Sequence, residues 1–245
     1  MHRLSLLLGL LITPVLADAG AATPATTSAS PAAATSSVSG IAWRYQLSDM
    51  LETQTGADGK PTHSLQLPVM DYFLTTIADL TEGYPPKFAS QADRDDVKDK
   101  LDRLLSILGV MDDGADTSTD VLRRQAFAWG LAYRFDEPGS GEKAIGLYEA
   151  LLKRNPDEPG ANFFYGEFLA NTVTLQSKSI PYLQKALLGG AKQANYTLGL
   201  VYVMQGDKTK GLACLEQYSK DYPDDQRAKQ VIDAVRNGKV TIHHS

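Results

Sequence analysis

The sequence predicts an all-α protein: an α-solenoid of stacked antiparallel helix pairs, with additional N-terminal helices and a C-terminal capping helix. Two observations carry this prediction. From Pro68 onward, apolar residues recur at three- and four-residue spacing, which is the period of helices buried on one side. In addition, Gly130, Gly166 and Gly199 stand in one local sequence frame, 36 and 33 residues apart, as expected of an internal repeat.

The chain opens with the pattern of a secretory signal peptide. After Arg3, an apolar run of 13 residues covers positions 4–16, and this run is too short to span a bilayer core of about 30 Å. Small residues follow at the places that a signal peptidase reads, so residues 1–17 are predicted to be removed, with a cut after Ala19 as the alternative. We therefore expect export without an integral membrane anchor, with the periplasm as destination and secretion as the alternative.

Residues 18–39 are predicted to be a disordered linker. They consist almost entirely of Ala, Thr, Ser and Pro, and such a segment cannot bury enough apolar area to offset its conformational entropy. At the other end, residues 239–245 follow Gly238 and are predicted to be a short tail.

Residues 40–67 leave two interpretations open. Partial two-residue alternation over 41–47 and 63–67, on either side of a glycine-containing turn, fits a small hairpin. An irregular segment that docks Trp43 and Tyr45 onto the helices behind it fits equally well.

The N-terminal region, residues 40–117, is predicted to hold two helices. The first has Pro68 in its first turn and closes at Gly83, before a Tyr-Pro-Pro sequence that forbids its continuation. The second begins after Ser90, a residue type that caps helices, and ends near Met111.

Residues around the three glycines resemble the tetratricopeptide repeat (TPR) family over roughly residues 122–225. Each glycine follows a large apolar residue, and an aromatic residue or leucine lies three positions further on: Trp129-Gly130 with Tyr133, Tyr165-Gly166 with Leu169, and Leu198-Gly199 with Tyr202. A unit of this family is about 34 residues long. The third repeat fits best in spacing, the first has two extra residues in its inter-helix turn, and the second has Gly189-Gly190 where the closing proline belongs.

The resemblance implies TPR-like helix pairs over residues 118–238, including a terminal helix over 225–236. Such a pair cannot bury its apolar face alone, so stacking is obligatory and the array needs a polar end. In this family the first helices of the pairs line a groove that binds another protein or a peptide segment. The inward positions carried onto this chain are Arg124, Phe127, Leu131, Arg134, Phe135, Phe163, Glu167, Asn171, Gln193, Tyr196, Leu200 and Met204.

Two features qualify this groove. Phe127, Phe163 and Tyr196 stand where the chaperone-binding members carry an early lysine, so a clamp for a C-terminal carboxylate is not expected. The aromatic residues of segment 40–90 also need somewhere to pack, and whether this segment folds back across the groove stays open.

No catalytic, metal or cofactor site is predicted. After the signal the only histidines are His63, His243 and His244, and the lone Cys214 is expected to pack as a small apolar residue. The acidic loop of Asp112, Asp113, Asp116 and Asp120 lacks the order of a calcium-binding EF-hand, and is predicted to be a solvated turn that caps the next helix through Ser118 or Asp120. The formal net charge of −5 argues against a nucleic-acid partner.

These features favour an exported scaffold or adaptor, not an enzyme, that binds a partner segment in its repeat groove. Two alternatives stay open. One is an inhibitor or immunity-type protein that blocks an enzyme, and the other is an enzyme whose site lies between the N-terminal helices and the repeats.

Overall fold

The computed structural model describes residues 39–239 apart from 56–58, 60, 84, 113, 115, 116 and 173, and it describes the backbone alone at Thr62 and His63. The predicted signal peptide, nearly all of the predicted linker, and the tail beyond residue 239 with its two histidines lie outside the described residues. The same is true of Asp113 and Asp116 in the acidic loop.

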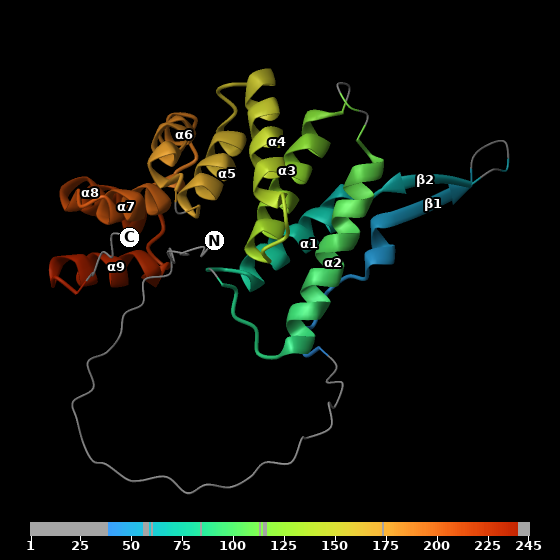
Figure 1. Ribbon diagram of the computed structural model, residues 1–245, viewed down its shortest axis with the longest axis horizontal. Helices are drawn as coiled ribbons and strands as arrows, with labels where there is room; N and C mark the ends of the chain where they lie inside the picture. The colour runs from blue at the N-terminus through green and yellow to red at the C-terminus, as the bar shows by residue number, and fades with distance from the viewer. Residues whose placement is uncertain are drawn as a thin grey trace, which may run out of the picture.

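The described part of the chain is mostly helical, as predicted (Figure 1). A short 3-10 helix, η1 (Leu47–Met50), precedes a hairpin of β1 (Leu51–Thr55) and β2 (Pro61–Leu65). Nine α-helices follow over these residues: α1 (Leu67–Leu80), α2 (Gln91–Val110), α3 (Thr119–Arg134), α4 (Ser140–Arg154), α5 (Pro159–Ala170), α6 (Gln176–Leu188), α7 (Ala194–Met204), α8 (Lys208–Asp221) and α9 (Gln226–Arg236).

Helices α3 to α8 form three successive pairs, and the pairs stand side by side in one row (Figure 1). Each helix packs mainly on its neighbour in the chain, and the first helices of successive pairs also touch one another, α3 with α5 and α5 with α7. These first helices therefore share one side of the row, which we call the inner face. The predicted α-solenoid is confirmed, and the long turn of the first repeat appears as residues 135–139 between α3 and α4.

The C-terminal end of the row is closed by α9. Its apolar side, with Ala228, Val231, Ile232 and Val235 buried, packs into one cluster with residues of α7 and α8. This is the capping helix that the sequence predicted, and its polar side remains in solvent because nothing further stacks on it among the described residues.

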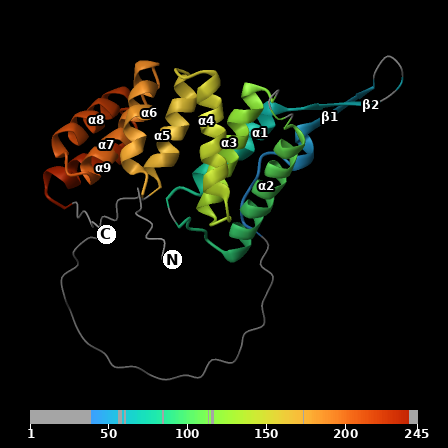
Figure 2. The same cartoon turned by 45° about the horizontal axis from the view of Figure 1, so that its top comes forward.

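The N-terminal end combines both interpretations of residues 40–67. Trp43 packs on Phe73 of α1, with ring centroids 5.5 Å apart, and its indole nitrogen donates a 2.8 Å hydrogen bond to Asp96 of α2. Residues 41–46 are therefore docked chain and not a strand, and Leu47 begins η1. The hairpin lies later, with Leu51 paired to Leu65 and Thr55 to Pro61, and it projects away from the helices (Figure 2).

Helix α1 lies against α3, the first helix of the repeat row. A continuous apolar cluster joins α1 and α2 to α3 through residues such as Phe73, Leu101 and Leu131. At its edge Arg124 of α3 makes a two-pronged ion pair with Asp71 of α1, with both N–O distances at 2.7 Å. The segment that precedes the repeats therefore covers part of their inner face.

Candidate functional site: a pocket between α3 and α5

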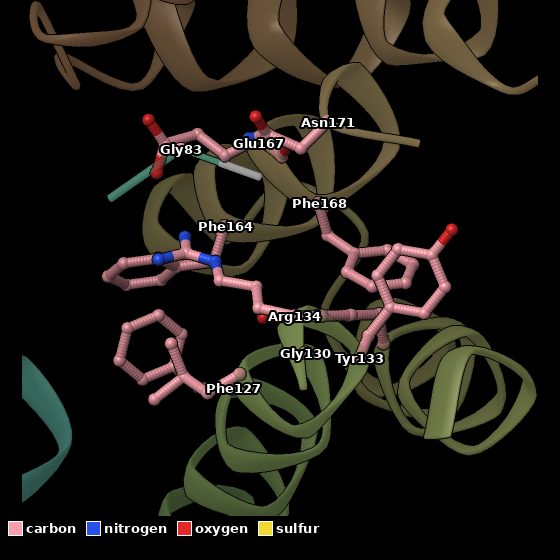
Figure 3. A pocket seen from close by; sticks show the side chains of 11 residues that line it. Gly83, Phe127, Gly130, Tyr133, Arg134, Phe164, Glu167, Phe168 and Asn171 are labelled. Carbon is pink, nitrogen blue, oxygen red and sulfur yellow. Dashed lines mark hydrogen bonds between the residues drawn. The ribbon is translucent and has the colours of Figure 1, made fainter. Parts of the chain in front are cut away.

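A pocket opens on the inner face where α3, α5 and the segment after α1 meet (Figure 3). Helix α3 contributes aromatic, small and basic side chains, α5 contributes two rings and an acid, and the helix end at Asn171 adds an amide. The lining residues are Gly83, Phe127, Gly130, Leu131, Tyr133, Arg134, Tyr148, Phe164, Glu167, Phe168 and Asn171.

Helical periodicity places these residues together. On α5, Phe164, Glu167, Phe168 and Asn171 are spaced three or four positions apart, so they project from the same side of that helix. The corresponding residues of α3 follow the same spacing from Phe127 to Arg134. The two helices contact each other, and their matched stripes face the same space.

The walls of the pocket are mainly aromatic. The Phe127 and Phe164 rings lie 5.0 Å apart between centroids, and Tyr133 meets Phe168 edge-on at 5.6 Å. Tyr148 of α4 is fully buried behind them, and burial raises the pKa of its phenol far above the ordinary value. Its hydroxyl therefore stays protonated across the physiological pH range.

Arg134 enters the pocket from α3 while tying down the end of α1. Its Nη1 atom donates to the backbone oxygens of Ala78 and Thr81 and to the Thr81 hydroxyl, each at 3.1 Å. These acceptors lie at the C-terminus of α1, where a cation also compensates the helix dipole. Burial lowers the pKa of the guanidinium, although it stays charged at any physiological pH.

Glu167 approaches the same pocket from α5, opposite Arg134 (Figure 3). Its Oε1 atom accepts a 3.1 Å hydrogen bond from the Thr197 hydroxyl of α7. Within the described chain the carboxylate forms no ion pair with Arg134 or with any other cation. Burial raises the pKa of Glu167, an effect that the Thr197 hydroxyl and the positive charge of Arg134 only partly oppose.

The segment after α1 closes one side of the pocket. Gly83 lines it with a φ of 83°, a left-handed conformation that glycine adopts without strain. The preceding residue, Glu82, forms a 3.0 Å ion pair with Arg227 of α9. Arg227 also pairs with Asp225 and lies over the Tyr196 ring, 5.2 Å from its centroid. The segment thus connects the beginning of the inner face to its far end.

Five of the twelve groove positions predicted from the sequence line this pocket: Phe127, Leu131, Arg134, Glu167 and Asn171. The other seven lie elsewhere. Arg124 is held by Asp71, Phe135 stacks on Phe88 with centroids 6.0 Å apart, and Tyr196 lies under Arg227. Gln193 is exposed just before α7, and Met204 is half-buried at the end of that helix.

Phe163 and Leu200 are the positions where packing departs most from the expected groove. Phe163 is 8% exposed and belongs to an apolar cluster with residues of α6 and α7, and Leu200 is 3% exposed in the cluster beneath α9. Both side chains fill spaces between helices and present almost no surface to a partner.

Six lining residues were not predicted from the sequence: Gly83, Gly130, Tyr133, Tyr148, Phe164 and Phe168. In the repeat consensus, Gly130 and Tyr133 count only as packing residues. The sequence could have indicated the two phenylalanines, because Phe164 and Phe168 lie on the same side of the helix as Asn171. A second series that starts at Phe163 also reaches Asn171 with helical spacing, and the sequence alone does not distinguish the two.

Comparison with known protein families gives a match for the third helix pair, α7 and α8. Residues 193–225, which include α7 and α8, match the model of the tetratricopeptide repeat family. This pair is therefore similar to a tetratricopeptide repeat. The TPR assignment predicted from the sequence is thereby confirmed where its spacing fits best. A search of the curated proteins finds no match to the chain.

Solved TPR structures share the fold. A thermophilic TPR protein of Thermus thermophilus, TTC0263, is 15% identical, covers 70% of this chain and 92% of its own, and superposes with a TM-score of 0.50. A double mutant of MamA RS-1 is 16% identical, covers 68% of this chain and 85% of its own, and also has a TM-score of 0.50. At this identity the likeness is one of fold.

Other kinds of site find little support in the described residues. In that part of the chain, no three histidine, cysteine or acidic side chains come together as metal ligands, and none of its helices has the length and apolar character needed to cross a membrane. Cys214 is half-buried, and burial raises the pKa of its thiol, which disfavours the reactive thiolate.

Proposed function

We propose that this protein is an exported scaffold that binds a segment of a partner protein in the pocket between α3 and α5. The observation that carries the proposal is the pocket itself: it lies on the inner face of TPR-like pairs and combines aromatic walls with a carboxylate that has no ion pair among the described residues. Aromatic residues in partly enclosed sites dominate the energetics of protein interfaces. Export is proposed from the apolar run at residues 4–16.

The shape of the site limits how a partner can bind. Helix α1 covers the first repeat next to Arg124, and Gly83 closes one side of the pocket. An extended peptide running along the whole inner face would have to displace both. The partner is therefore proposed to insert a side chain or loop tip into the pocket, entering beside the exposed Asn171.

The enzyme alternative shares this location, because polar groups do converge where the N-terminal helices meet the repeats. Among the lining residues, however, Glu167 is the only carboxylate, and the lining includes no cysteine, serine or histidine that could act with it. General acid–base catalysis ordinarily needs a second positioned group. The binding function is therefore the better supported of the two.

Site-specific photocrosslinking tests the proposal. A benzoylphenylalanine at Asn171, on the exposed rim of the pocket, is compared with one at Lys153, which is exposed on α4 in the outer layer of the row. In envelope extract we expect a discrete crosslinked partner from position 171 and not from 153. Equal crosslinking at both positions, or none at 171, would overturn the proposal. Inhibition of a purified effector enzyme at equal stoichiometry would instead favour the inhibitor alternative.

A further inference from the structure

The two charged side chains that face the pocket, Arg134 and Glu167, differ in how many hydrogen-bond partners they have. The positive charge of Arg134 is already placed at the C-terminus of α1, against two backbone oxygens and a hydroxyl. The negative charge of Glu167 has a single hydroxyl donor, from Thr197, and no ion pair within the described chain. The Glu167 side chain is half-buried, and a partly buried carboxylate with so few partners is costly. A positive charge that a partner brings beside it would therefore be favoured.

A second hydrogen-bond acceptor lies at the rim. The Asn171 side-chain nitrogen donates a 2.8 Å hydrogen bond to the backbone oxygen of Glu167. This bond fixes the amide so that its oxygen is left without a protein donor among the described residues. Glu167 and Asn171 together therefore offer acceptors, and the side chains that only donate are those of lysine, arginine and tryptophan.

The walls favour a cation over a neutral donor. The faces of Phe127, Phe164 and Tyr133 carry the negative part of the ring quadrupole, which attracts an ammonium or guanidinium group within about 6 Å of a ring centroid. The cavity volume is about 50 Å³, which suits the tip of one side chain. It is too small for a whole peptide.

We propose that the pocket recognises a basic side chain, lysine or arginine, that the partner inserts against the Glu167 carboxylate and beside the aromatic rings of the walls. This inference rests on the proposed function, since it names the chemistry of the residue that the scaffold captures. It differs from a carboxylate clamp, because the charge supplied by the partner is positive.

The test uses small probes that isolate the charge. The isotope-labelled mature chain is titrated with N-acetyl-arginine amide and N-acetyl-lysine amide, and with N-acetyl-citrulline amide as the neutral isostere of arginine. Backbone NMR signals of Gly130 and Asn171 report on the pocket. We expect at least one basic probe to bind in the millimolar range, and citrulline about tenfold more weakly.

Variants separate the charge from the fold. Glu167→Gln keeps the size of the side chain and should weaken the basic probe about tenfold, down to the affinity of citrulline. The matched control, Glu142→Gln on the exposed first turn of α4, should leave binding unchanged. Both variants are first checked for native circular dichroism.

Three results would overturn the inference: no response to either basic probe, equal binding of citrulline, or equal binding by Glu167→Gln. These outcomes are distinct from a failure of the proposed function. If crosslinking at position 171 persists in Glu167→Gln with undiminished yield, the scaffold function is supported, and the inference that the pocket recognises a basic side chain is rejected. If the wild-type chain gives no crosslink at 171, the function itself falls.

Discussion

The glycine at the equivalent position of each repeat, Gly130, Gly166 or Gly199, has a different structural role in the first repeat than in the second and third. In the second and third repeats it lets two helices touch: a Cβ atom on Gly166 would lie 2.7 Å from Leu183 Cγ, and one on Gly199 would lie 2.7 Å from Leu215 Cγ. In the first repeat a Cβ on Gly130 would meet only the Phe168 ring edge, at 3.4 Å. There the missing side chain opens the pocket and does not bring α3 and α4 together.

This difference shows that a repeat position can be kept in sequence while its role changes. Where the glycine is in contact with its own second helix, it is a requirement of the fold. Where it faces the next first helix, the space it leaves becomes available to a partner. Two glycine substitutions test this contrast directly, and two glutamate substitutions test the pocket that Gly130 leaves open. They are ordered here by the size of the expected effect.

Gly199→Ala should have the largest effect. Its new Cβ would come within 3.0 Å of the Gly211 backbone oxygen as well as the Leu215 side chain, and a backbone atom cannot yield as a flexible side chain does. We expect a loss of about 2–3 kcal/mol from overpacking, measured by urea denaturation. Gly146→Ala on α4, where nothing lies within 4 Å, is the control and should gain up to about 1 kcal/mol. A Gly199→Ala protein as stable as wild type would remove the contrast.

Glu167→Gln should stabilise the protein by up to about 1 kcal/mol at neutral pH, because it removes a half-buried charge that has no ion pair among the described residues. The effect depends on pH. Burial raises the folded-state pKa of Glu167 above its ordinary 4.5, so the wild-type charge is destabilising above the folded-state pKa. This penalty is relieved as the pH falls through that value, and it is absent below about 4.5. Denaturation midpoints of the wild-type and Glu167→Gln proteins are measured at pH 7 and pH 4. A stability difference that is the same at both pH values would show that the charge of Glu167 does not destabilise the folded protein.

Gly130→Ala should change stability little, with a gain of up to about 0.5 kcal/mol from helix propensity. The 3.4 Å approach to the ring of Phe168 is an ordinary contact. The new methyl group would nevertheless occupy the pocket, so binding of the arginine probe should weaken while the unfolding midpoint holds. A destabilisation as large as that of Gly199→Ala would mean that the two glycines are equivalent after all.

Glu82→Gln should have the smallest effect, at most about 0.5 kcal/mol, because exposed ion pairs contribute little. Its partner Arg227 keeps the Asp225 carboxylate at 2.7 Å. We expect the unfolding midpoint to move by less than that of Glu167→Gln, and crosslinking at position 171 to rise as the segment after α1 is held less firmly. Unchanged crosslinking would show that this segment does not limit access.

Much of the helical order could be predicted because it is local. Pro68 in the first turn of α1, Ser90 and Ser118 as N-caps of α2 and α3, and the apolar stripe of α9 all act within a few residues. The third repeat was predictable for the same reason, since its spacing follows the consensus.

The site was only partly predictable, because a rotation of one residue decides which side chain faces inward. Phe163 and Phe164 are neighbours on α5, about 100° apart around its axis, and either could begin a series ending at Asn171. Packing against α6 and α7 takes Phe163 into the core and leaves Phe164 in the pocket. Helix α1 covers part of the inner face, and this depends on the ion pair between Asp71 and Arg124, which lie 53 positions apart in the chain. No local sequence pattern predicts such a contact.

The ion pair between Glu82 and Arg227 joins residues 145 positions apart, and it bears on how this array could grow. In an open solenoid each unit contacts only its neighbours, so a unit can be added or removed without breaking contacts elsewhere in the array. Here an additional helix pair inserted between α6 and α7 would carry α9 outward by about one helix spacing, roughly 10 Å, and Glu82 could no longer reach it. The number of units is therefore matched to the length of the segment that spans them, so that duplication or deletion of a unit would have to be accompanied by a change in that segment.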